Sequence, residues 1–191
     1  MAGPFSLVGQ YDVTNSGNRF CGILATAAAI PISNTTAPTA CLWNRTGSAV
    51  KLVLERMSVG WVATTEAPGN ILMNQLQASG AAPGTGLPLT AFTAAVLNTT
   101  VFCSKLGAGN IPQGSFGTAA TLTTAGVPFM TTGLSNLTNT GTATFGAWTS
   151  DYFFYDSVIV MPGTFVYPTA SAATLSTYNI SLWWREVSVT D

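Results

Sequence analysis

The clearest pattern in the chain is an alternation of apolar and polar side chains in the segment Thr177–Val189. One set of alternate positions holds Tyr178, Ile180, Leu182 and Trp184, and the other holds Asn179, Ser181, Trp183 and Arg185. Successive side chains of a β-strand point to opposite faces of a sheet. The segment therefore predicts a half-buried strand near the end of the chain.

The segment Val50–Ala63 also alternates, but its phase changes part of the way along. Leu52 and Leu54 occupy one parity, whereas Met57, Val59 and Trp61 occupy the other. One extra residue in a strand, a β-bulge, keeps a single face buried across such a change. We therefore predict a bulge near Glu55 and Arg56.

Further strands are predicted where apolar and β-branched runs end at Gly and Pro. The segments are 19–29, 70–78, 151–161 and a strand that starts at 164–167. Segment 70–78 also fits a short helix, and the run 151–161 predicts a strand that is buried on both faces. Turns are expected at 31–38 and at Pro162–Gly163.

The region Leu89–Thr149 is rich in Thr, Ala and Gly, with bulky residues only at intervals. It fits either long irregular loops or short outer strands. Because no amphipathic helix of three turns can be drawn anywhere, the pattern predicts an all-β fold. We expect an extended N-terminal arm at residues 1–18 and a single β-sandwich domain at 19–191.

Charge is unusually scarce in this chain. Six basic and seven acidic side chains make up 7% of the 191 residues, against about 25% in ordinary soluble domains. No apolar run reaches the roughly 20 residues that a membrane-spanning helix needs. We therefore expect much of the surface to be covered in an assembly, with no membrane partner and, since no basic leader precedes an apolar run, synthesis in a host cytoplasm.

Catalytic and metal-binding groups are few. The chain has no histidine, and Cys21, Cys41 and Cys103 are widely spaced, which favours buried free thiols. Asp151 and Asp156 are five positions apart and so should point to opposite faces of a strand. The basic residues occur singly, which argues against a phosphate-binding patch. We expect no enzyme activity, cofactor, metal or nucleic acid, although a hydrolase built from carboxylates that the fold brings together stays an alternative.

Two ion motifs lie in apolar strands, where an unpaired charge is costly. They are Glu55–Arg56 and Arg185–Glu186. If the two strands are neighbours, opposite charges can match across the ladder. The alternative is that each charge lies on a solvated face or an edge.

The tryptophans divide by their phase. Trp61 and Trp184 are in phase with apolar neighbours and are expected in the core, whereas Trp183 is out of phase and is a candidate for a subunit interface. A sugar-binding platform is the alternative use of the exposed aromatic residues.

Three stretches of the sequence resemble a family. The stretches RMSVGWVATTEAPGN, YDSVIVMPGTFVYPTASAA and TYNISLWWREV are similar to the small jelly-roll virion proteins encoded beside the head genes of tailed bacteriophages. Such proteins end in a strand with a W-x-E pattern, here Trp184–Glu186, after a Pro-Gly turn and an Ala/Ser-rich loop. The resemblance covers about a third of the chain, and nothing in the region 89–149 takes part in it.

The resemblance implies a jelly-roll-like antiparallel β-sandwich that decorates or cements a capsid as a homotrimer. Its partners would be further copies of itself and the major capsid protein or other virion proteins, with the arm docked on a neighbouring shell subunit. A receptor- or glycan-binding module of a spike or tail is the alternative. Candidate contact residues are Phe5, Leu7, Tyr11, Trp148 and Trp183.

Overall fold

The computed structural model describes most of the sandwich. It covers residues 18–63, 70–77, 89–94, 101–103, 111–122, 124–132, 149–172 and 177–190. These residues form eleven strands and no helix, so none of them builds a helix that could cross a bilayer. Residues 1–17 of the expected arm, and with them Phe5, Leu7 and Tyr11, lie outside the described residues, as does Trp148.

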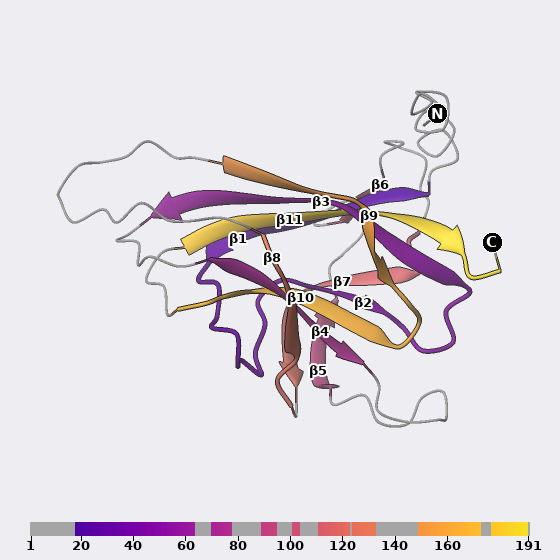
Figure 1. Cartoon of the computed structure of the whole chain (residues 1–191), viewed down its shortest axis with the longest axis horizontal. Coiled ribbons are helices and arrows are strands. Elements are labelled where there is room, and N and C mark those ends of the chain that lie inside the picture. Colours follow the sequence, from indigo (N-terminus) through magenta and orange to yellow (C-terminus); the bar gives the residue numbers. More distant parts are fainter. Residues whose placement is uncertain are drawn as a thin grey trace.

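The strands are numbered in chain order. They are β1 (Arg19–Ala28), β2 (Cys41–Asn44), β3 (Val50–Ala63), β4 (Ile71–Gln77), β5 (Leu89–Ala94), β6 (Val101–Cys103), β7 (Gly114–Leu122), β8 (Val127–Thr131), β9 (Thr149–Val160), β10 (Thr164–Ala170) and β11 (Thr177–Ser188). One sheet has the order β6-β1-β11-β3-β9, and the other has the order β5-β7-β2-β10-β4-β8. Figure 1 shows the two sheets as the two layers of a sandwich, so the predicted all-β sandwich is confirmed.

The pairing of the strands is nested. β1 pairs with β11, β2 with β10, β3 with β9 and β4 with β8, all antiparallel. The first strand thus pairs with the last, and each of the next three strands pairs with the next one in from the other end. Successive pairs alternate between the five-stranded and the six-stranded sheet. The strands between β4 and β8 widen the sheets: β6 lies beside β1, while β7 and β5 continue from β2.

The core fills the space between the sheets and follows the predicted alternation. In β11, Tyr178, Ile180, Leu182 and Trp184 are all buried, as are Leu52, Leu54, Met57 and Val59 on both sides of the phase change in β3. The indole of Trp184 stacks on Phe20 of β1 with ring centroids 5.8 Å apart. Trp184 is therefore a core residue as predicted, whereas the side chain of Trp61 lies outside the described part of the structure.

The turn between β9 and β10 joins the two sheets. Thr164 N–H donates to the carbonyl of Met161 over 3.0 Å, and Gly163 has a φ of 85°. Proline at the second position and a glycine with positive φ at the third are the requirements of a type II turn. The predicted Pro-Gly turn is confirmed.

Two expectations about strands are corrected. β9 belongs to a sheet that packs against the other sheet through one face only, so its inward side chains are buried and its outward side chains are exposed. β2 was not predicted as a strand, and β7 lies in the region for which short outer strands were one alternative, yet the two pair with each other inside the six-stranded sheet. Segment 70–78, left between strand and helix, is the strand β4.

The three cysteines are buried thiols without a disulfide, as expected. Burial raises the pKa of the Cys21 thiol to about 12, and burial also raises the pKa of Cys41. Because the thiolate is the reactive form, such thiols are poor nucleophiles and poor metal ligands at neutral pH.

A close approach between the sheets depends on glycine at position 22. A Cβ built on Gly22 would lie 2.3 Å from Cγ of Phe116 on β7, inside the core. We expect Gly22→Ala to lower the free energy of unfolding by about 2–3 kcal/mol, because the added methyl forces the packed ring to move. Urea denaturation followed by tryptophan fluorescence measures the loss.

Gly47→Ala is the matched control. Gly47 has a φ of 80°, but a Cβ there meets no atom within 4 Å. The control carries only backbone strain, about 1 kcal/mol. Equal losses for the two variants would contradict the close-packing explanation.

Candidate assembly surface

Charge is concentrated on the outer face of the five-stranded sheet, which we call the charged face. The described residues carry nine charged side chains, and the strand register, together with the irregularities in β3 and β9, places all but Arg45 and Glu186 on this face. The seven are Arg19, Lys51, Glu55, Arg56, Asp151, Asp156 and Arg185. A chain with so little charge therefore has one distinctly polar surface.

An irregularity in strand register shapes this face. Trp183 and Trp184 are consecutive in β11, but their partners in β3 are separated by Glu55, which has no partner there. On the other side of β3, four residues of β9, 154–157, lie opposite Glu55. The predicted bulge in β3 is confirmed, and the edge strand β9 has a larger bulge directly opposite it.

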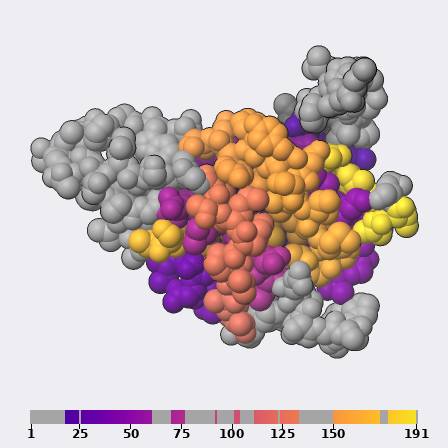
Figure 2. All heavy atoms as spheres, in the orientation of Figure 1, coloured from indigo at the N-terminus to yellow at the C-terminus, as the bar shows by residue number. Residues whose placement is uncertain are grey.

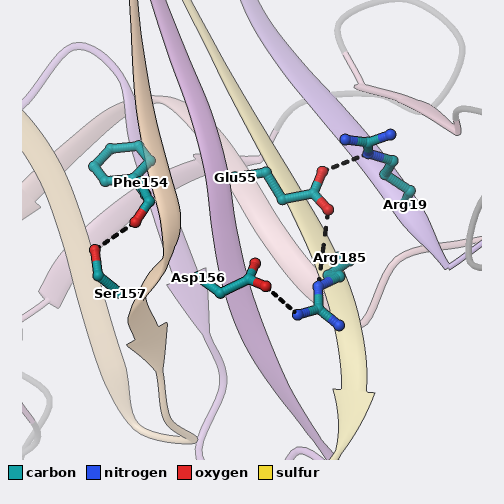
Figure 3. Close-up of polar contacts among 6 residues, drawn as sticks. All are labelled: Arg19, Glu55, Phe154, Asp156, Ser157 and Arg185. Atoms are coloured by element: carbon teal, nitrogen blue, oxygen red, sulfur yellow. Dashed lines mark hydrogen bonds and ion pairs between the residues drawn. The ribbon is translucent and has the colours of Figure 1, made fainter. Parts of the chain in front are cut away.

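The bulge in β9 has an unusual backbone. Tyr155 and Asp156 have φ angles of 49° and 60°, the left-handed region that residues other than glycine rarely adopt. The hydroxyl of Ser157 donates to the carbonyl of Phe154 and closes the loop (Figure 3). This conformation turns the Asp156 side chain onto the charged face.

Asp151 and Asp156 consequently share a face, which corrects the expectation that they would lie on opposite sides. Asp151 accepts a hydrogen bond from Ser58 and lies 3.7 Å from Nη1 of Arg56, whereas Asp156 reaches Arg185. The alternation of side chains between the two faces breaks down here because Tyr155 and Asp156 do not have an extended backbone. The strand period applies only while the backbone stays in the β region.

The centre of the charged face is a chain of four alternating charges. Arg19 Nε donates to one carboxylate oxygen of Glu55, and Nε of Arg185 lies 3.8 Å from the other. The second guanidinium also contacts Asp156, with Nη2 to Oδ2 at 2.9 Å. Figure 3 shows Glu55 between the two arginines, with Asp156 on the far side of Arg185. The chain links β1, β3, β11 and β9.

This arrangement solves an electrostatic problem. Arg19 and Arg185 lie directly opposite each other in the β1–β11 pair, where like charges destabilise a sheet. Glu55 neutralises both because the bulge sends its side chain to the same face as Arg56 instead of the opposite one. Only 16% of the Glu55 side chain is exposed, so the ion pairs are partly shielded from water.

The expected matching of Glu55–Arg56 with Arg185–Glu186 is thus half correct. Glu55 pairs with Arg185, but Arg56 does not meet Glu186. Arg56 contacts Asp151 and places its guanidinium carbon 4.7 Å from the ring centroid of Trp183. Glu186 follows the regular alternation of β11 and points to the core side.

Exposed apolar side chains border the ion chain on the β9 side. Phe153 is 48% exposed, Tyr155 is 87% exposed and Ile159 is 50% exposed. The rings of Phe153 and Tyr155 are 6.1 Å apart. In Figure 2 the orange atoms of residues 149–172 cover a broad area of the surface. These three residues were missed as candidates because their run predicted burial on both faces, although the polar pair Asp156–Ser157 within it signals the interruption.

Trp183 lies on the charged face, as its phase predicted, and is half-buried under Arg56. It is the only one of the five candidate contact residues that falls in the described part of the chain. Its role as a subunit contact stays a prediction.

A second feature lies near the C-terminal end of β11, on the side of the strand that faces the core. The Glu186 carboxylate accepts hydrogen bonds from Gly114 N–H (2.8 Å), Gln113 N–H (3.1 Å) and Trp184 Nε1–H (3.4 Å). Beside it is an open hollow of about 590 Å³, which we call the Glu186 hollow. Its lining residues are Asn18, Phe20, Ala49, Val50, Ile111, Gln113, Glu186 and Ser188.

The pKa of Glu186 reflects two opposing causes. Burial raises it above the ordinary value of 4.5, and the hydrogen bonds from Gly114, Gln113 and Trp184 offset part of the rise. Among the residues that the structure describes, no group of three or more His, Cys, Asp or Glu side chains could hold a metal ion.

The Glu55 interaction can be tested by removing its charge. We expect Glu55→Gln to lower the free energy of unfolding by about 1–2 kcal/mol, since it leaves two facing guanidiniums without their shared carboxylate. Urea denaturation at low salt and at 1 M salt measures the effect, and the high-salt loss should be smaller because the Debye length falls to about 3 Å.

Asp151→Asn is the control for Glu55→Gln. The Asp151 side chain is 43% exposed and its ion pair is long, so the change should stay within about 0.5 kcal/mol. If both variants lose the same stability, Glu55 has no special place in the network.

The raised pKa of Glu186 predicts a pH dependence. At a pH between 4.5 and the raised pKa, Glu186 is protonated in the folded protein but ionised in the unfolded chain. The ionised form is favoured in the unfolded chain, so the folded state loses stability as the pH rises through this range. The contribution of Glu186 to stability is therefore largest below pH 4.5. We expect the stability of the wild type relative to Glu186→Gln to fall above pH 4.5, at no more than about 1.4 kcal/mol per pH unit. Denaturation curves of both proteins between pH 4 and 8 test this, and a constant difference would contradict it.

Comparison of the chain with protein-family models, with curated proteins and with solved structures yields no significant match. What the protein does is therefore inferred from its own residues. The charged face, its apolar border on β9 and the Glu186 hollow are the features available for that inference.

Proposed function

We propose that the chain is a structural protein of a tailed bacteriophage virion, which decorates or cements the capsid as a homo-oligomer. A trimer is the expected state, and the major capsid protein or another virion protein is the expected partner. The protein would be made in the host cytoplasm and act on the capsid surface, without catalysis or a cofactor.

The observation that carries the proposal is the apolar border of the charged face. Phe153, Tyr155 and Ile159 expose large apolar groups on one edge strand, next to arginines that are already paired with carboxylates. Aromatic residues and arginine are enriched in protein interfaces. Because the two arginines Arg19 and Arg185 balance the carboxylates of Glu55 and Asp156, a partner can cover this ion chain without burying an unpaired charge.

The strand order supports the finer expectation of a jelly roll. Without the three strands between β4 and β8, the two sheets read β1-β11-β3-β9 and β2-β10-β4-β8. Eight antiparallel strands in two sheets, paired first with last and second with next-to-last, are the arrangement of a jelly roll. This fold is common in viral capsid proteins and in lectins.

A glycan-binding module of a spike or tail is the second candidate. The exposed rings of Phe153 and Tyr155 lie beside the carboxylate of Asp156, which could accept hydrogen bonds from sugar hydroxyls. Aromatic faces commonly pack against the apolar faces of ligands. The lectin examples of the same fold keep this candidate open.

The first test is the mass of the purified protein by light scattering, followed by sedimentation with undecorated capsid shells. We expect an oligomer that sediments with the shells. A variant that lacks residues 1–17 should keep its oligomeric mass but lose the shells if the arm makes the shell contact.

A monomer that ignores shells would contradict the decoration proposal. Binding of that monomer to a glycan array would favour the second candidate. An oligomer that ignores shells would keep self-assembly but would reject the capsid as its partner.

A further inference from the structure

Tyr155 is an aromatic side chain held away from the body of the sandwich. It lies in the β9 bulge, whose backbone is left-handed and is closed by the hydrogen bond from Ser157 to the Phe154 carbonyl. Its only described ring neighbour is Phe153, and almost the whole side chain is exposed. A large amphipathic side chain that contributes little to its own fold is available to a partner.

The Glu186 hollow has the complementary chemistry. Ala49, Val50 and the exposed Ile111 give it apolar groups, and Glu186 gives it a hydrogen-bond acceptor. A carboxylate offers about four lone-pair sites, and the described contacts of Glu186 use three of them. The hollow is open to solvent on one side, and its volume of about 590 Å³ is enough to receive one aromatic side chain.

We propose that Tyr155 of one copy inserts into the Glu186 hollow of a second copy, where its phenol donates a hydrogen bond to the Glu186 carboxylate. This proposal rests on the self-assembly proposed above and specifies its contact. Tyrosine suits such a site because its ring packs on apolar walls while its hydroxyl satisfies a polar group.

The contact would be heterologous. Tyr155 lies on the edge strand β9, whereas Glu186 lies on β11 between β1 and β3. Each copy therefore offers one knob, the Tyr155 side chain, and one hollow, the Glu186 hollow, at different places. A repeated contact of this kind closes into a ring when the rotation permits. The expected trimer is one such ring.

Two variants separate the two sides of the contact. Tyr155→Gly removes the knob and also relieves the left-handed strain, so it should fold at least as well as wild type. Ala49→Trp fills the hollow from an exposed position at its rim. Val127→Ala is the control, because it trims an exposed apolar side chain on the edge strand of the other sheet.

We expect each of the first two variants to weaken self-association by about tenfold or more, while Val127→Ala has no effect. An equal mixture of Tyr155→Gly and Ala49→Trp should give a dimer mass, because one intact knob still meets one intact hollow. Light scattering measures all four samples, and urea denaturation shows that each variant is folded.

The outcomes distinguish this proposal from the one on which it rests. A wild-type protein that is monomeric overturns self-assembly itself. A wild-type oligomer that survives Tyr155→Gly overturns the knob alone. Loss on Tyr155→Gly without loss on Ala49→Trp, or a mixture that stays monomeric, overturns the hollow as its receptor.

Discussion

The register offset at Glu55 determines which side chains face outward across the five-stranded sheet. Without the extra residue, the buried positions before and after it in β3 would lie on opposite faces, and one half of the strand would turn its apolar side chains to solvent. With it, both halves contribute to the same core, and Glu55 reaches two arginines that would otherwise repel each other. The bulge in β9 lies directly opposite the same offset, with residues 154–157 facing Glu55. Packing, electrostatics and the exposed aromatic pair thus meet at one place in the five-stranded sheet.

The same offset bears on how the molecule meets other chains. An edge strand offers unpaired backbone groups that can recruit another strand, and bulges are a common way to prevent this. The four residues of β9 that lie opposite Glu55 interrupt its ladder in the middle of the strand. Contact through side chains on the charged face is therefore favoured over extension of the sheet, and side-chain contacts are more specific than backbone pairing. In a chain with so little charge, keeping that edge irregular also limits unwanted association.

The sequence predicted the strands in which apolar and polar residues alternate clearly, because this alternation follows directly from burial of one face. The alternation of β11 and the phase change of β3 are written in consecutive residues, so the strands, the bulge and the core position of Trp184 could all be predicted. β7 could not, because its Thr, Ala and Gly residues alternate weakly and its place is fixed by pairing with β2, which is far away in sequence. The run in β9 predicts burial on both faces, since its consecutive apolar residues do not reveal that only one face of the sheet is covered by another layer. The charged face required the sheet order, because its ion pairs join residues from four strands.

The nested pairing places the start of β1 and the end of β11 side by side, and this brings several features to one end of the sandwich. The Glu186 N–H donates to the carbonyl of Asn18 over 2.8 Å, so the point where residues 1–17 join the domain is held against β11. Asn18 also lines the Glu186 hollow. If the hollow receives a side chain from a neighbouring copy, and the preceding segment contacts the shell, the two contacts would meet at Asn18. Occupation of the hollow would then constrain where the N-terminal segment leaves the domain, so that self-assembly and shell binding would be coupled through one residue pair.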